Sequence, residues 1–129
     1  MEVQLVSPEQ VLYEGVANMV VVRTLGGGDI AFQNDHAPFL GALADWSARV
    51  KFEDGSQKWF AVHGGFVEVS HNHVIILSDI AELPAQIDVG RAQAAKAKAE
   101  DALRANPDDE EAQAASLRAD VRLEVAAEG

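Results

Sequence analysis

The first part of the chain alternates short apolar runs with turn residues, a pattern that predicts β-strands. Gly26-Gly27-Gly28 is a predicted turn, and Glu53-Asp54-Gly55-Ser56 is a hairpin signal between two strand-like segments. The apolar and β-branched runs lie at 3–5, 19–22, 30–32, 46–52, 57–62, 66–69 and 74–77. Many short strands at even spacing predict a β-sandwich or barrel over residues 1–85.

The pattern changes after Pro84, where alanine and long polar helix formers dominate. Asp88 is the predicted N-cap of a first helix that ends near Ala105. Asn106 is the predicted N-cap of a second helix, with Pro107 at its first helical position. The fold class is therefore mainly β with an α tail, in which an antiparallel helix hairpin over residues 86–129 follows the sandwich.

The two predicted helices offer mostly small apolar side chains to each other. The expected contacts place one set of residues against another: Ala92, Ala95, Ala99, Ala102 and Leu103 against Ala115, Leu117 and Val121. Burial contributes about 25 cal/mol for each Å² removed from water, so small side chains contribute little. We therefore expect a hairpin of marginal stability, docked on another surface or able to leave it.

Composition narrows the function classes. The formal net charge of −11 disfavours nucleic acid and anionic lipid as partners, and the absence of cysteine excludes disulfides and thiol chemistry. The first residues lack the basic start and apolar run of a signal peptide, and no apolar stretch approaches the roughly 20 residues of a membrane helix. We expect a cytoplasmic protein that meets a membrane only through its partners.

The histidines suggest one alternative function. His71 and His73, together with Glu68, would suit a small cupin-like metalloprotein, because alternate strand residues share a face. The apolar run after His73 lacks the acidic ligand that such a site usually places there, which favours turn histidines without a metal. A ligand-binding β-sandwich is a further alternative, although no cluster of aromatic residues supports it.

The segment from Ile87 to Ala92 allows two interpretations. In the first, Asp88 is only a helix cap and Arg91 an exposed residue of the first turn. In the second, Arg91 belongs to a clamp for a purine and its phosphates, joined by basic residues of the hairpin. The candidates for that role are Lys98, Arg118 and Arg122.

Several motifs, in order along nearly the whole chain, resemble the epsilon-subunit family of F-type ATP synthases. They are Val6-Ser7-Pro8-Glu9-Gln10 with Leu12-Tyr13-Glu14-Gly15, Gly28-Asp29-Ile30, His36-Ala37-Pro38-Phe39-Leu40, Gly64-Gly65-Phe66-Val67-Glu68-Val69 with Asn72, Val74, Leu77 and Asp79, and Ile87-Asp88 with Arg91-Ala92. Each motif is weak by itself, but their order ahead of a predicted helix hairpin is specific.

This resemblance implies a sandwich of about ten strands in the central stalk of the proton-translocating synthase. The sandwich would contact the gamma subunit and the membrane ring of c subunits. Carried over by position, Asp29, His36, Ala37 and Pro38 are the expected ring-facing residues. The family further implies a peripheral place on the cytoplasmic face of the bacterial plasma membrane, and no catalytic residue or metal in this subunit.

The resemblance also implies a regulatory role for the hairpin. In the family it folds against the sandwich or extends toward the catalytic hexamer, where contact with the beta subunit inhibits ATP hydrolysis. In some members ATP binds the folded hairpin as a regulator, with no cofactor required otherwise. Glu82, Asp88 and Arg91 match that ATP site.

Overall fold

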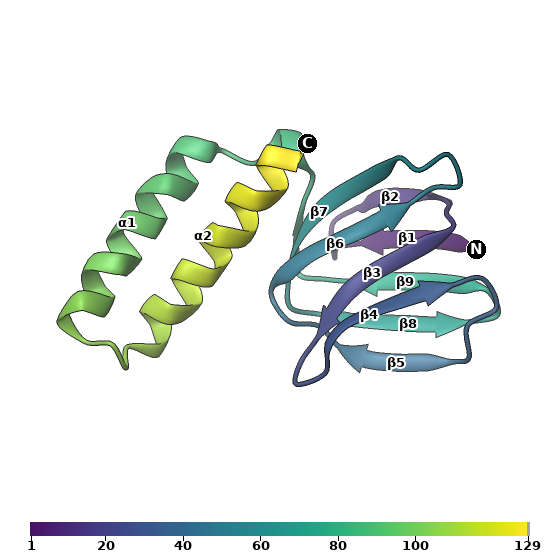
Figure 1. The fold of residues 1–129 in the computed structure, drawn as a ribbon, viewed down its shortest axis with the longest axis horizontal. Coiled ribbons are helices and arrows are strands. Elements are labelled where there is room, and N and C mark those ends of the chain that lie inside the picture. The colour runs from purple at the N-terminus through teal and green to yellow at the C-terminus, as the bar shows by residue number, and fades with distance from the viewer. Residues whose placement is uncertain (129) are drawn as a thin grey trace.

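The computed structural model describes residues 1–128 as two stacked sheets followed by a pair of helices (Figure 1). The strands are β1 (Glu2–Val6), β2 (Val11–Val16), β3 (Met19–Thr24), β4 (Gly28–Gln33), β5 (Phe39–Ala42), β6 (Trp46–Lys51), β7 (Gln57–His63), β8 (Phe66–Ser70), β9 (His73–Leu77) and β10 (Ile80–Glu82). A short 3-10 helix, η1 (Pro84–Gln86), leads to α1 (Val89–Ala105) and α2 (Glu110–Glu128). The predicted fold class is confirmed.

Each sheet has five strands. One has the order β2-β1-β9-β8-β5, and the other has the order β10-β7-β6-β3-β4. Within residues 1–128, neighbouring strands pair antiparallel except β1 and β9, which run parallel. The predicted hairpin at 53–56 joins β6 to β7, and the predicted glycine turn joins β3 to β4.

The core lies between the sheets, where the inward residues of each strand meet. Val3 and Leu5 of β1 show the expected alternation, since both are 1% exposed while Glu2 is exposed. The largest fully buried side chains are Phe32 of β4 and Phe60 of β7. Because this core closes without the helices, the sandwich has its own source of stability.

The helix hairpin follows η1, and its first cap is the predicted one. The Asp88 side chain accepts a hydrogen bond from the Arg91 amide at 3.0 Å. The predicted start of the second helix is wrong: α2 begins at Glu110, and Asp109 accepts from the Ala112 amide at 3.0 Å. Asn106 instead ends α1 and caps a turn, since its side chain accepts from the Asp108 amide.

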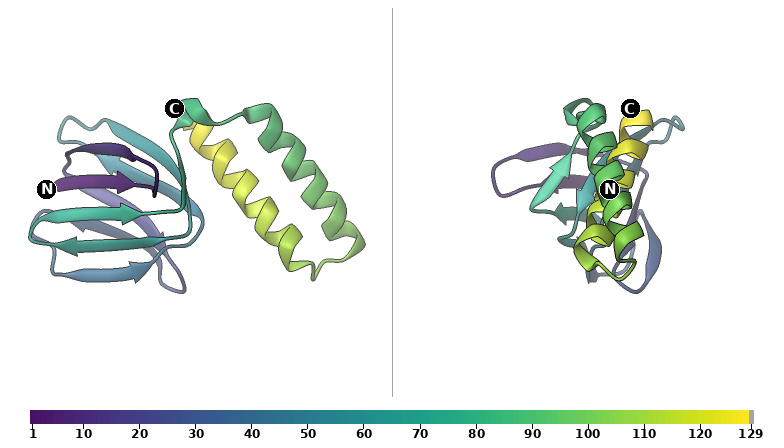
Figure 2. Two further views of the ribbon diagram at one scale, coloured as in Figure 1. Left: turned by 180° about the vertical axis from the view of Figure 1, so that it is seen from behind. Right: turned by 90° about the vertical axis from the view of Figure 1, so that its left-hand side faces the viewer.

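The helix α2 lies between α1 and the sandwich, as two views show (Figures 1 and 2). Ala112 and Ala119 are buried along one face, whereas Val121 and Val125 are buried in a cluster with Ala61 of β7. Two residues along a helix of about 3.6 residues per turn span more than half a turn, so Ala119 and Val121 face opposite neighbours.

The predicted helix–helix contact is therefore correct only in part. Ala92 and Ala99 are buried as expected, but Ala95 is exposed and Leu117 is 39% exposed. Val121 packs against the sandwich rather than against α1, because α2 packs against α1 on one face and against the sandwich on the other. Neither helix described by the structure is long and apolar enough to cross a lipid bilayer.

Candidate functional site

A cleft of about 390 Å³ lies where the sandwich joins the helix hairpin. It is bounded by the end of β10, by η1, by the first turns of α1 and by α2. Its lining residues are Glu82, Gln86, Asp88, Arg91, Ala92, Ala95 and Arg122. All three residues expected to bind ATP, namely Glu82, Asp88 and Arg91, are thus brought together.

One carboxylate connects three elements at the floor of this cleft. Glu82 of β10 accepts a hydrogen bond from Arg122 Nε of α2, with Oε1 at 2.7 Å. The same oxygen lies 3.1 Å from His63 Nε2 of β7. The His63 side chain is only 3% exposed, and its Nδ1 has no hydrogen-bond partner. The His63 ring is therefore held by a hydrogen bond at Nε2 only.

Burial is the main influence on the protonation state of His63. Desolvation lowers the pKa of His63 below its ordinary value, and the Arg122 guanidinium lowers it further. The hydrogen bond to Glu82 and the charge of Asp45 oppose this shift without cancelling it. His63 is therefore neutral at pH 7, donates from Nε2 to Glu82 and carries a lone pair on the unpartnered Nδ1.

The cleft combines features that suit an anionic ligand. The first turn of α1 borders it, and the positive end of the helix dipole favours negative charge there, although the Arg91 amide is already capped by Asp88. The guanidinium groups of Arg91 and Arg122 come from different helices and line the same space. Of the other basic candidates, Arg118 pairs with Glu111 at 3.3 Å, and neither Arg118 nor Lys98 lines the cleft.

Two residues of this region had not been expected. The Gln86 side chain accepts a hydrogen bond from the Leu83 amide at 2.9 Å, and this bond fixes η1. His63 belongs to an apolar strand run, and its link to Glu82 depends on the pairing of β7 with β10. Only the strand register, in which Ile80 lies opposite His63, brings these two side chains together.

The residues expected to face a membrane ring lie at two places. Asp29, near the start of β4, pairs with Arg23 at 2.8 Å and lies 3.9 Å from Arg49. The segment from His36 to Pro38 follows the other end of β4, about 13 Å away at the usual rise of a strand. The structure therefore does not join them into one patch.

The segment before Pro38 is well anchored. The amide of Asp35 donates to the Asn72 side chain at 2.9 Å, and the N-terminal amine donates to the Asn34 side chain at 2.6 Å. The His36 ring packs edge-on against Phe32, with centroids 4.9 Å apart. Ala37 and Pro38 are exposed, so this loop presents a fixed shape to solvent.

An apolar row crosses the outer face of the first sheet. Ala42, Phe66, Leu77 and Val6 stand opposite one another on the neighbouring strands β5, β8, β9 and β1. Phe66 is 56% and Leu77 45% exposed, and Leu40 beside them is 71% exposed. A hollow of about 450 Å³ adjoins the row at Val6, Phe66 and Leu77. Exposed apolar side chains grouped in this way are typical of interaction surfaces.

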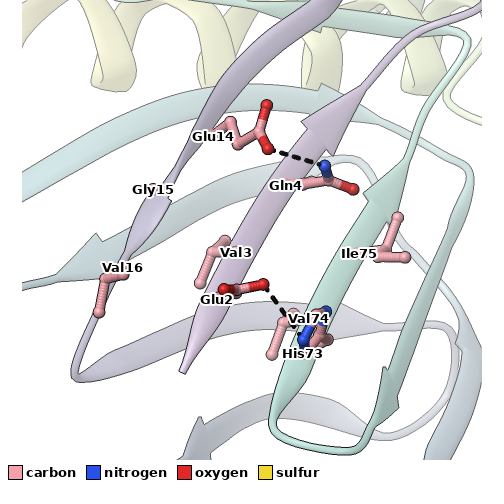
Figure 3. A pocket seen from close by; sticks show the side chains of 9 residues that line it. All are labelled: Glu2, Val3, Gln4, Glu14, Gly15, Val16, His73, Val74 and Ile75. Carbon is pink, nitrogen blue, oxygen red and sulfur yellow. Dashed lines mark hydrogen bonds and ion pairs between the residues drawn. The ribbon is translucent and has the colours of Figure 1, made fainter.

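The other end of this outer face carries a polar groove of about 240 Å³ across β2, β1 and β9 (Figure 3). Its side chains pair with one another: His73 Nε2 lies 3.1 Å from Glu2, and Gln4 donates to Glu14 at 3.3 Å.

The cupin-like alternative finds no support in this geometry. His71 lies in the β8–β9 turn with a positive φ of 50°, whereas Glu68 stands opposite Ile75. Within residues 1–128, no group of three His, Asp or Glu side chains is arranged to hold a metal ion. His71 and His73 do not occupy alternate positions of one strand, because His71 lies in the turn and β9 begins at His73.

Comparison with known proteins gives a consistent result. A family model described as "ATP synthase, Delta/Epsilon chain, beta-sandwich domain" matches residues 1–84. The ATP synthase epsilon chain of Shouchella clausii is 40% identical over 126 residues, covering 97% of this chain and 93% of the relative. That of Symbiobacterium thermophilum is 44% identical over 130 residues, covering 98% and 92%.

Solved structures share the fold. A chain in the mitochondrial ATP synthase of Euglena gracilis, from a structure of OSCP, F1 and c-ring, superposes with a TM-score of 0.71 at 21% identity. The match covers 98% of this chain and 76% of that one. A chain of the central stalk and c-ring of the Tetrahymena thermophila mitochondrial enzyme gives a TM-score of 0.54 at 20% identity, covering 66% and 67%.

Proposed function

The chain belongs to the epsilon family of F-type ATP synthase subunits, and from this premise we propose that it couples and regulates the rotary motor without an active site of its own. The observation that carries the proposal is the joint presence of a self-sufficient sandwich and a hairpin held to it mainly through α2. Such a subunit would act through the position of its helix hairpin relative to its sandwich. Its place in a proton-translocating synthase, on the cytoplasmic face of a bacterial plasma membrane, belongs to the same proposal.

The apolar row on β5, β8, β9 and β1 is the proposed surface for the gamma subunit. Burying Phe66, Leu77 and the neighbouring Leu40 against a partner removes large exposed apolar side chains of this face from water. Because the row is formed by four neighbouring strands, it presents a rigid and continuous contact. A partner with a complementary apolar face can bind it without a conformational change.

Replacing Phe66 by aspartate should weaken binding to purified gamma at least tenfold, because a carboxylate would be buried in an apolar contact. The binding constant is measured by titration calorimetry. Gln33→Asp, which adds the same charge on the exposed outer side of β4, is the matched control and should bind as the original chain does.

The same variants test the function as a whole. Added to an ATP synthase depleted of its epsilon subunit, the original chain and Gln33→Asp should lower ATP hydrolysis, whereas Phe66→Asp should not at equal concentration. The proposal fails if the original chain neither binds gamma nor changes hydrolysis.

The anchored loop at His36, Ala37 and Pro38 is the proposed contact with the c-ring. Its backbone is fixed through Asn72 and the N-terminal amine, so it can transmit a turning force without yielding. Asp29, with its arginine partners, would meet the ring or a neighbouring subunit at a second point. Two separated contacts resist tilting better than one.

The hairpin is the proposed inhibitory element, through contact with the beta subunit when it leaves the sandwich. The fully buried part of its docking surface is a cluster of four residues, Val121, Val125, Ala61 and Ile87, and the half-buried Trp46 and Trp59 pack against this cluster. A two-state element of this kind needs a difference of only a few kcal/mol between its positions.

We further propose that ATP binds in the cleft as a regulator and stabilises the docked hairpin. Arg91 and Arg122 with the N-terminus of α1 supply the positive side for the phosphates, while Glu82 and Asp88 supply hydrogen-bond acceptors. The cleft is formed by both the sandwich and the hairpin, so a ligand there binds the docked state and shifts the equilibrium toward it.

Arg91→Ala should abolish ATP binding while leaving the sandwich folded, because Arg91 is exposed, lines the cleft and has no part in the core. Titration calorimetry measures the binding and thermal unfolding measures the fold. Arg104→Ala removes another exposed arginine, from the far end of α1, and should leave binding unchanged. Saturable binding of equal strength by both variants would exclude this cleft.

A further inference from the structure

We propose that His63, Glu82 and Arg122 form a proton-sensitive latch, which holds the hairpin on the sandwich and weakens when His63 takes up a second proton. The inference rests on the proposed mobility of the hairpin. The three side chains come from β7, β10 and α2, so only Arg122 departs if the hairpin leaves. The latch therefore spans the boundary that is proposed to open.

The docked arrangement suits a neutral imidazole. Glu82 Oε1 already accepts from Arg122 Nε at 2.7 Å and lies 3.1 Å from His63 Nε2. A second proton would set two cations against one carboxylate at a side chain that is 3% exposed. The new N–H would lie on Nδ1, which is buried without an acceptor, and an unmet donor of this kind is costly.

The other charged groups around His63 do not reverse this effect. Asp45, next to the start of β6, favours the protonated ring, as Glu82 does. Arg122 of α2 disfavours it, η1 carries no ionisable side chain, and Lys58 lies at the opposite end of β7. Burial is the largest effect, so the pKa of His63 lies below its ordinary value of 6.5 while the hairpin is docked.

Release of the hairpin removes Arg122 and admits water, while Glu82 and Asp45 stay beside the ring on the sandwich. The pKa of His63 must then rise, since the groups that lower it are lost and those that raise it remain. The released state binds more protons than the docked state. Docking is therefore strongest above the pKa of the released ring and weakens as the pH falls from that pKa toward the lower pKa of the docked ring, by up to about tenfold for each pH unit.

The first experiment measures the pKa of the His63 ring by NMR in the full chain and in Val125→Asp, the variant expected to release the hairpin. His63→Gln identifies the resonance. The ring should titrate at a higher pH in the released variant, and each unit of difference equals a tenfold change in docking. Equal pKa values in the two chains would overturn the latch.

The second experiment follows docking itself. A dye acceptor on Asp108→Cys, the single thiol of the chain, receives energy from Trp46 and Trp59, which pack beside α2. Transfer in the otherwise unchanged chain should fall between pH 8 and pH 5.5. In His63→Gln, whose amide can donate to Glu82 but cannot take up a proton, that fall should be absent.

The control is His73→Gln, since His73 is 54% exposed on the opposite sheet and should leave the pH dependence intact. A fall of equal size in His63→Gln would overturn the latch. If transfer is constant with pH but low in Val125→Asp, the latch fails while the mobile hairpin stands. If Val125→Asp also keeps the docked value, the proposed mobility fails with it.

Discussion

Replacing Val125 by aspartate should release the helix hairpin from the sandwich and leave the sandwich folded. Val125 is fully buried in a cluster with Ala61, Ile87 and Val121, so the variant loses a buried valine and places a carboxylate in an apolar contact. The two effects together cost at least about 3 kcal/mol, which shifts the docking equilibrium roughly 100-fold. Energy transfer from the tryptophans to a dye at position 108 measures the shift.

The control for this variant is Ala127→Asp, which places the same charge on an exposed position of α2 two residues further on. It should stay docked. The sandwich should remain folded in both chains, because its core does not include α2, and Val125→Asp should lose only the stabilisation that docking adds. With an epsilon-depleted synthase, Val125→Asp should inhibit hydrolysis more than Ala127→Asp, since its hairpin is free to extend. Equal transfer in the two variants would contradict the docking described above.

Replacing Gly65 by alanine should destabilise the sandwich by at least about 3 kcal/mol. Gly65 joins β7 to β8 with a φ of 107°, a conformation that side chains rarely adopt. An added Cβ would overlap the carbonyl oxygen of Leu77 and lie 2.8 Å from the Cα of Ser78. Both obstacles are backbone atoms of the β9 end, and the Gly65 carbonyl must still accept the Leu43 amide.

Gly55→Ala separates the two contributions. Gly55 also has a positive φ, of 89°, but nothing lies within 4 Å of a Cβ built there. Its cost should be the conformational term alone, about 1–2 kcal/mol. Urea unfolding followed by tryptophan fluorescence gives both values. A similar loss of stability in the two variants would show that the overlap at Leu77 is relieved by a small shift.

Local signals predicted most of the β-sandwich. The hairpin at Glu53 to Ser56 and the alternation around Val3 and Leu5 depend on neighbours in sequence, and both are observed. The sheet order and the parallel pairing of β1 with β9 depend on residues about 70 positions apart, and no local pattern contains them. The family resemblance implied a sandwich of about ten strands, but it gave neither the sheet order nor this pairing.

The helices show where prediction from the local sequence fails. Asn106-Pro107 has the composition of a helix start, yet Asn106 also serves as the end of α1, and Asp109 takes the cap of α2. The apolar spacing identified Val121 as a buried position. It did not show that Val121 packs on the sandwich, because a period of about 3.6 residues defines the buried face of a helix and not the element that covers it. Three residues of the cleft, Glu82, Asp88 and Arg91, were named from the sequence and the family resemblance, whereas the place of His63 depends on the register of β10.

The parallel pairing of β1 with β9 also sets an order of events during synthesis of the chain. The β1–β2 hairpin leaves the ribosome first, but one edge of β1 has no neighbour until Leu77 has been made. Contacts between residues so distant in sequence slow folding, because the intervening loop must first be closed. The sandwich can therefore be completed only after β9 and β10 have emerged, which is just ahead of α1.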